Sequence, residues 1–404
     1  MWHIEGTRHF RTCIKTLQRN SLRSVFFLEW NSKLGKAVPM KSSNWQYRGF
    51  KLFALFSTII TQPILLVWCY QANKSVTGSV TLVSKYASVM SAFIAFTVLP
   101  YLRFFAKESN SRKFVTYFHE ILNLDKRLTV YILLKLMVTK SKYRPRKLDT
   151  VTKIANLGTF TMNYIAPAFI IWASVTNNSP FNGFILHLLN VTRINFFIRV
   201  ITATLFCITF NIFISITYLC ILFTASGILV LHFWSNYLLI KNLSFYTTIK
   251  VYNQLKIMTI FMQEVGHDLV TVCLHHAYMV LFGTIVAYHF ILQFTHGKDI
   301  SVGVTLTALI MFSFTTGTEI LIICIVSKAS KKSKETLRKL LLNHGKNRYR
   351  RRVILSMLPN SISLEFIDSV DTIRNGIGMD YFLRYVERVQ SYTSTLLLAT
   401  KHKI

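Results

Sequence analysis

Six long apolar stretches constrain this chain more than any other feature of its sequence. They are Phe50–Tyr70, Ser84–Phe104, Ile154–Val175, Phe196–Trp234, Val270–Phe294 and Val302–Val326. Each is long enough to cross a hydrocarbon core of about 30 Å, which takes about 20 helical residues. Inside lipid such a segment must be helical, because only a helix satisfies its backbone polar groups within one segment. The sequence therefore predicts an all-α, polytopic membrane protein.

The positive charge of the chain is concentrated in alternate segments between the apolar stretches. The net charge is +31, and Lys and Arg are concentrated in residues 1–49, 107–147 and 328–352. The alternate loops Gln71–Leu82, Thr176–Asn195 and Thr295–Ser301 hold few charges. Because Lys and Arg stay on the cytoplasmic side of a membrane, the N-terminus is expected inside. The basic charge then faces anionic membrane lipid, and no nucleic acid is expected as a partner.

The fourth stretch, Phe196–Trp234, is longer than one span requires, since one helix of this length measures about 60 Å. Two spans would place the basic residues 328–352 outside, against the positive-inside rule. The stretch also contains no Pro and no cluster of turn residues. We therefore expect one long helix that projects into the cytoplasm.

Four regions follow from this pattern. Residues 1–49 form a cytoplasmic N-terminal segment, residues 50–327 hold six transmembrane helices with cytoplasmic extensions, and residues 328–379 form a basic cytoplasmic segment. Residues 380–404 hold an atypical seventh helix over Tyr381–Thr400, which is charged at its start and apolar at its end. The C-terminus is then extracellular. Phe114–Val138 has apolar residues at helical spacing, and predicts a helix that extends the second span, packs on its neighbours or binds a partner.

Three N-x-Ser/Thr triplets fall in the predicted outer loops and are candidate glycosylation sites. They begin at Asn73, Asn177 and Asn190. A fourth triplet, at Asn242, falls inside in this topology and is expected to remain unmodified.

Catalytic motifs are missing from the sequence, so an enzyme is not expected. It contains no Walker loop, no G-x-S-x-G and no H-E-x-x-H. His275 and His276 are adjacent and point to different faces of a helix, which makes them poor joint metal ligands. No metal or other cofactor is predicted. Glu319 is the one clear carboxylate within the spans, either a pore or ligand residue or a buried hydrogen-bonded group.

Three short segments carry a resemblance to a known family. They are Tyr117–Leu128 after the second span, Lys334–Leu342 after the sixth, and Ser391-Tyr392 in the last helix. With its inside N-terminus and long helix extensions, the chain resembles the insect gustatory receptors. Ser391-Tyr392 stands where that family has Thr-Tyr, whereas Leu398 and Ala399 replace its Gln-Phe.

This resemblance implies a ligand-gated cation channel in the plasma membrane of a sensory neuron dendrite. It implies seven helices, a homo- or hetero-tetramer with related receptors, and a pocket that opens to the outer face and binds a small-molecule tastant. Two alternatives stay open: an olfactory-type subunit that opens with a separate partner subunit, and an unrelated polytopic transporter or membrane enzyme.

Candidate site residues follow from the same topology. Polar and aromatic residues in the outer halves of the spans are candidates for ligand binding, although packing in the bundle is the more common role of such residues: Tyr86, Ser91, Tyr164, Trp172, Tyr288, His289 and Gln293. The resemblance places Tyr392–Leu397 beside the conduction path. Helical spacing puts Tyr392, Thr395 and Leu396 on one face, and Thr393 and Leu397 on another. We expect Leu396 to form the constriction of the pore.

Overall fold

The computed structural model describes residues 2–74, 82–135, 146–175, 180–188, 195–240, 243–269, 280–281, 283–288, 291, 331–358, 362 and 379–401. The chain divides into two compact units, Met1–Ser226 and Gly227–Ile404. Within the described residues the structure is helical apart from one short hairpin. This agrees with the predicted all-α class, while the number of spans, their topology and the four region boundaries stay predictions.

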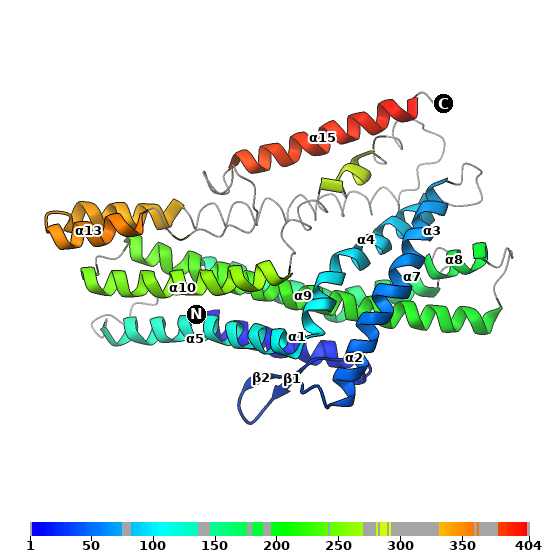
Figure 1. Cartoon of the computed structure of the whole chain (residues 1–404), viewed down its shortest axis with the longest axis horizontal. Coiled ribbons are helices and arrows are strands. Elements are labelled where there is room, and N and C mark those ends of the chain that lie inside the picture. Colours follow the sequence, from blue (N-terminus) through cyan, green and yellow to red (C-terminus); the bar gives the residue numbers. More distant parts are fainter. Residues whose placement is uncertain are drawn as a thin grey trace. The chain divides into compact units, whose positions relative to one another are not determined.

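The first three apolar stretches lie in continuous helical segments of the first unit (Figure 1). They are α2–η1–α3 (Trp45–Phe56, Ser57–Thr61 and Gln62–Lys74), α4 (Leu82–Phe105) and α6–η2–α7 (Arg146–Phe160, Thr161–Ile165 and Ala166–Val175). The segments η1 and η2 are single π-turns inserted into α-helices, which occur frequently at functional sites. A short helix, α8 (Pro180–Leu188), packs on α3 and α4.

The fourth stretch is one helix, α9 (Phe196–Ile240), of 45 residues, as the sequence predicted. At 1.5 Å per residue it measures about 67 Å, roughly twice the thickness of a hydrocarbon core. Its first ten residues expose large apolar side chains, whereas Ile221 is the one exposed residue between Phe206 and Leu239. The outer end is therefore suited to lipid, and neighbouring helices cover the rest.

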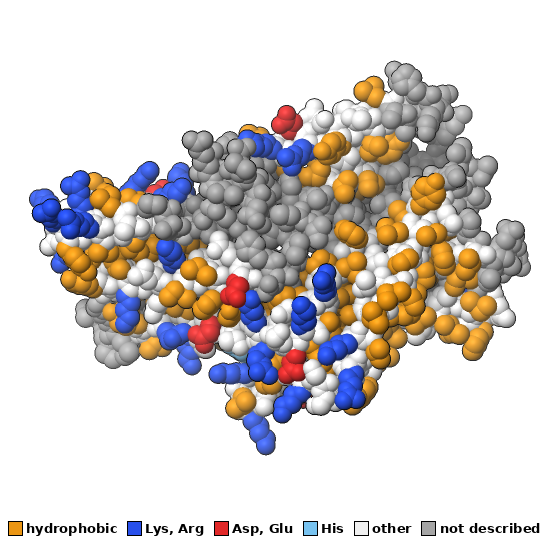
Figure 2. Space-filling model, viewed as in Figure 1, with side chains coloured by type: hydrophobic (Ala, Val, Ile, Leu, Met, Phe, Trp, Pro, Cys, Tyr) orange, Lys and Arg blue, Asp and Glu red, His pale blue; other side chains and the backbone are white. Residues whose placement is uncertain are grey.

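Two of the described helical segments, Trp45–Gln71 and Phe196–Ile240, are long and apolar enough to cross a membrane. This criterion uses length and composition alone, and the buried core helix of a soluble protein meets it as well. Figure 2 shows hydrophobic side chains gathered over α2, α3 and the beginning of α9. A large exposed apolar surface of this kind is typical of a surface that meets lipid or protein.

Before the first span, the chain builds a layer that the sequence analysis did not predict. It consists of α1 (Trp2–Asn20) and the antiparallel strands β1 (Leu28–Asn31) and β2 (Lys36–Pro39), and it packs on α5 (Glu108–Lys135). We call it the N-terminal layer. Phe10 of α1 stacks on Phe118 of α5 with 3.9 Å between the ring centroids. The predicted helix Phe114–Val138 therefore coincides with α5 up to Lys135, and α5 packs on α1 and β2.

In the second unit, the described elements are α10 (Phe245–Leu269), a helix over residues 331–344, α13 (Arg348–Met357) and α15 (Met379–Lys401). The helix α15 contains the predicted seventh helix Tyr381–Thr400. The sixth apolar stretch, Val302–Val326, and most of the fifth, Val270–Phe294, lie outside the described residues.

Candidate functional site

The predicted ligand-binding residues are only partly described. Ser91 is buried in α4, Tyr164 lies in η2 with 61% of its surface exposed, and Tyr288 is half-buried. Tyr86 and Trp172 belong to α4 and α7, but their side chains lie outside the description, as do His289 and Gln293. The tastant pocket therefore stays a prediction. Of the three glycosylation candidates, Asn73 lies in the last turn of α3, and Asn177 and Asn190 fall outside the described residues.

The predicted pore helix α15 has one packed face and one open face. Tyr385 and Val389 form a buried cluster with Val280, and Thr393 continues the same face one turn later. Gly283 makes this packing possible, because a Cβ atom there would lie only 3.1 Å from the Tyr385 hydroxyl. The packed face thus follows the i, i+4, i+8 spacing of a helix.

The open face of α15 is polar over most of its length. The residues on the side away from the packed face are all exposed: Leu383, Arg384, Glu387, Arg388, Gln390, Ser391, Ser394, Thr395 and Leu398. Two of them, Leu383 and Leu398, are apolar. Tyr392 lies at the edge of this face and is 50% exposed, whereas Leu396 follows Val389 by seven residues, on the packed side, and is 39% exposed. A helix that crosses a membrane cannot turn such a face toward lipid, because charged and hydroxyl groups need water or protein partners there.

The first predicted span exposes large apolar side chains, which a helix of a soluble protein would turn toward the core. Its exposed residues are large and apolar: Leu52, Leu55, Phe56, Ile59, Ile60, Leu66 and Val67. Its buried face contains apolar residues such as Phe50, Leu65 and Trp68, and also Ser57, Thr61 and Gln62, around the π-turn η1. The sequence analysis missed these three polar residues. Their signal was polar spacing at i, i+4 and i+5 within an otherwise apolar span, since polar groups in spans face the bundle interior.

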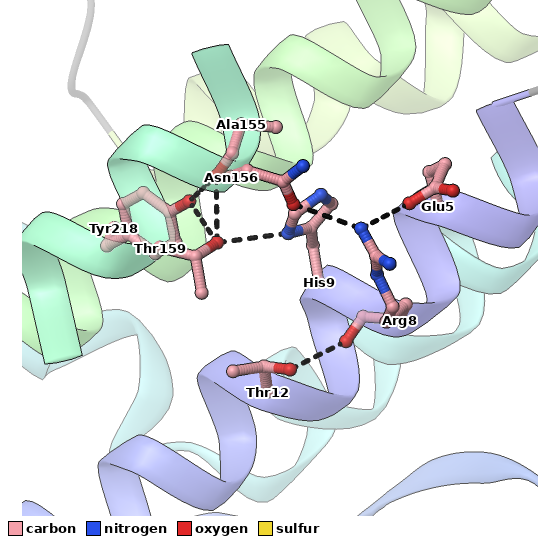
Figure 3. Close-up of polar contacts among 8 residues, drawn as sticks. All are labelled: Glu5, Arg8, His9, Thr12, Ala155, Asn156, Thr159 and Tyr218. Carbon is pink, nitrogen blue, oxygen red and sulfur yellow. Dashed lines mark hydrogen bonds and ion pairs between the residues drawn. The ribbon is translucent and has the colours of Figure 1, made fainter. Parts of the chain in front are cut away.

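The N-terminal helix α1 is joined to α6 and α9 by polar contacts (Figure 3). The His9 ring nitrogen Nδ1 lies 3.0 Å from the Thr159 hydroxyl, which lies 3.0 Å from the Tyr218 hydroxyl. Tyr218 also donates a hydrogen bond of 3.2 Å to the Ala155 carbonyl. Burial, followed by the nearby Arg8 charge, lowers the pKa of His9. A neutral His9 is thus favoured in this contact.

Further along α1, the contacts reach the π-turn η2 of the third span. The Thr16 hydroxyl donates a hydrogen bond to the Asn163 side-chain oxygen, and Arg19 donates to the Asn163 carbonyl over 3.2 Å. Near the end of α1, the Asn20 amide donates to the Ser215 hydroxyl over 2.9 Å. The N-terminal helix is therefore fixed to one side of two predicted spans over most of its length.

In the second unit, lysines of the helix 331–344 bind the end of α9. Lys332 donates to the Asn236 side-chain oxygen over 2.9 Å, and Lys339 donates to the Leu239 carbonyl over 2.6 Å. Cations are favourable at the C-terminus of a helix, where unpaired carbonyl groups concentrate. Among the described residues, no group of three or more His, Cys, Asp or Glu could hold a metal ion.

Comparison with solved structures shows what fold the chain shares with known proteins. No protein-family model matches the chain, and no curated protein matches its sequence. Among solved structures, the chain is similar to the insect olfactory receptor OR5 from Machilis hrabei, determined in complex with eugenol. The TM-score is 0.52 and the sequence identity 12%, over 98% of this chain and 99% of the other. At this identity, the likeness shows a common fold over nearly the whole chain.

Proposed function

We propose that this protein is a chemoreceptor of the insect type, a ligand-gated cation channel opened by a small molecule. The observation that carries the proposal is the open polar face of α15. A membrane helix with one packed face and one face of charges and hydroxyl groups is suited to line a water-filled path. The fold shared with an insect olfactory receptor supports the same assignment.

A single copy of α15 cannot enclose a pore, so the proposed channel is an oligomer. Several copies would meet around an axis with their polar faces inward, and the resemblance to insect gustatory receptors favours a tetramer. In this arrangement Tyr392, Thr395 and Leu396 lie on or beside the conduction path. The packed residues Tyr385, Val389 and Thr393 hold each helix to its own subunit.

We further propose that the ligand is a tastant and that the receptor lies in the plasma membrane of a sensory neuron dendrite. Ser391-Tyr392 at the Thr-Tyr position favours a gustatory receptor. An olfactory-type subunit that needs a separate partner is the second candidate. It is favoured by the fold of the solved neighbour, an olfactory receptor in complex with eugenol. The predicted pocket residues in the outer halves of the spans are the proposed ligand contacts.

Expression of the chain in cells that lack chemoreceptors, followed by calcium imaging against a panel of tastants, tests the proposal. A gustatory channel that works alone gives a dose-dependent calcium signal, which disappears when external calcium is removed. A signal that requires co-expression of a partner receptor identifies the olfactory-type alternative. A properly inserted surface protein that conducts no ion under either condition contradicts the channel assignment.

A further inference from the structure

Four polar atoms in the middle of the first predicted span lie buried without hydrogen bonds. They are the Ser57 and Thr61 hydroxyl oxygens and the two amide atoms, Nε2 and Oε1, of Gln62. Within the part of the chain that the structure describes, none of these atoms has a hydrogen-bond partner. The three residues are at most 4% exposed. They therefore combine full burial with unused hydrogen-bonding capacity.

The π-turn η1 explains why Thr61 lacks the partner that a helical threonine usually finds. In an α-helix, a threonine hydroxyl can donate to the carbonyl four residues earlier, as Thr58 does to Ala54 over 2.8 Å. For Thr61 that carbonyl belongs to Ser57, and the π-turn gives it to the backbone amide of Gln62. The Thr61 hydroxyl makes no such bond, so its hydrogen-bonding capacity is unused within the described residues.

Unsatisfied groups at this depth are energetically costly. A buried donor or acceptor without a partner destabilises a protein, because the group has lost its hydrogen bonds to water and gained none in return. The helices of the first predicted span pack on α4, whose buried residues include Ala92 and Ala95. Polar side chains beside small ones form the setting in which proteins hold internal water or a polar ligand group.

We propose that Ser57, Thr61 and Gln62 form a buried binding site for the hydroxyl group of a small uncharged molecule. The hydroxyls offer donors and acceptors, and the Gln62 amide offers both, whereas no charged group belongs to the set. A resident water molecule and an alcohol ligand share this chemistry. The site does not depend on the channel function proposed above, because it follows from the unpaired atoms alone.

Radiolytic hydroxyl-radical labelling of the full-length protein in lipid nanodiscs tests the site. Radicals formed from a bound water molecule oxidise the side chains beside it, even where bulk solvent has no access. The buried residues Leu65 and Trp68, one and two turns beyond Thr61, report on the site by mass spectrometry. The same measurement is repeated with benzyl alcohol and with toluene, which has the same ring but no hydroxyl group.

The expected result is oxidation of Leu65 or Trp68 that falls severalfold in the Thr61→Val and Gln62→Leu variants. Thr58→Val is the matched control, because Thr58 is exposed and already bonded within its helix, so labelling stays unchanged. Suppression by benzyl alcohol but not by toluene identifies the occupant as an alcohol ligand. Labelling that neither compound changes identifies it as resident water.

Two outcomes overturn the proposal. One is a wild-type protein whose Leu65 and Trp68 stay unlabelled and whose thermal unfolding is shifted equally by benzyl alcohol and toluene. The other is labelling that persists in both site variants at the wild-type level. The wild-type measurements need no substitution, so a variant that fails to fold does not prevent a decision.

Discussion

Asn163 connects two segments that are far apart in the sequence, the helix α1 and the π-turn η2. It lies in the π-turn η2 of the third span, and it accepts hydrogen bonds from Thr16 through its side chain and from Arg19 through its carbonyl. A polar side chain at this depth is expected to be costly unless it is paired. Here the pairing comes from α1, which precedes every predicted span.

We expect Asn163→Leu to destabilise the protein by about 1–3 kcal/mol, because the Thr16 hydroxyl loses its acceptor. The measurement is thermal unfolding in detergent of the variant and the wild type. Asn123→Leu is the control, since Asn123 makes only a local contact of 3.4 Å with Glu120 on α5. Equal unfolding temperatures for the two variants would show that the contact between α1 and η2 contributes nothing to stability.

The residue Leu396 tests the proposed pore. If an apolar ring closes the path by excluding water, Leu396→Ser should ease its wetting and raise the resting cation current. The control is Leu397→Ser, the same change on the next residue, which is half-buried beside the packed face. The measurement is whole-cell current normalised to surface expression. Wild-type leak in Leu396→Ser, with normal surface expression and ligand response, would remove this residue from the constriction.

At the scale of elements, the sequence predicted the long apolar helices and α5, but it did not predict the elements that precede the first span. The single helix α9 followed from its length and the lack of turn residues, and the amphipathic spacing indicated α5. The sequence analysis missed the N-terminal layer, although the buried residues of α1, such as Gly6, Phe10 and Leu17, recur at helical spacing. The contacts that fix α1 were not predictable, because its partners lie more than a hundred residues away, such as Thr159 for His9. The two π-turns were also unpredicted, since no local residue pattern specifies them.

The hairpin β1–β2 is joined to α5 by a pH-sensitive contact. The Ala37 backbone amide donates to His119 Nε2 over 3.1 Å, so this nitrogen must be unprotonated. Burial, followed by the Lys36 charge, lowers the pKa of His119, while the Glu120 carboxylate raises it. The balance favours the neutral ring that the contact requires.

We therefore expect the hairpin to loosen on acidification. Because the pKa of His119 is lowered in the folded protein, the unfolded chain binds the proton more readily. The contribution of this contact to the stability of the hairpin is therefore present above pH about 6.5 and is lost as the pH falls below it. The measurement is hydrogen-exchange protection of residues 28–39, corrected for the intrinsic pH dependence. His119→Gln should remove most of the change between pH 7.5 and pH 5.5, values that span the ordinary histidine pKa of about 6.5. An undiminished change in this variant would assign the effect to another group.

At the scale of the whole molecule, the sequence predicts the arrangement of charge better than it predicts the functional site. The net charge of +31 and its alternation between loops led directly to an inside N-terminus. The ligand pocket depends on which spans meet in space, and sequence spacing within one helix cannot specify this. The polar face of α15 was predictable in part. The spacing of its residues can be read from the sequence, whereas its packing partners Val280 and Gly283 lie about a hundred residues earlier and cannot.

The predicted topology determines which asparagines along the chain can be glycosylated. With the N-terminus inside, Asn73 at the end of α3 and Asn190 face the lumen during synthesis, whereas Asn242, just beyond α9, faces the cytoplasm. The mass shift of the expressed protein should therefore shrink in Asn73→Gln and Asn190→Gln and stay unchanged in Asn242→Gln, as followed by electrophoresis with and without glycosidase. Epitope tags should be accessible without permeabilisation at the C-terminus alone. A shift that depends on Asn242, or an N-terminal tag stained on intact cells, would invert the topology and place the basic residues 328–352 outside, against the rule that governs short loops.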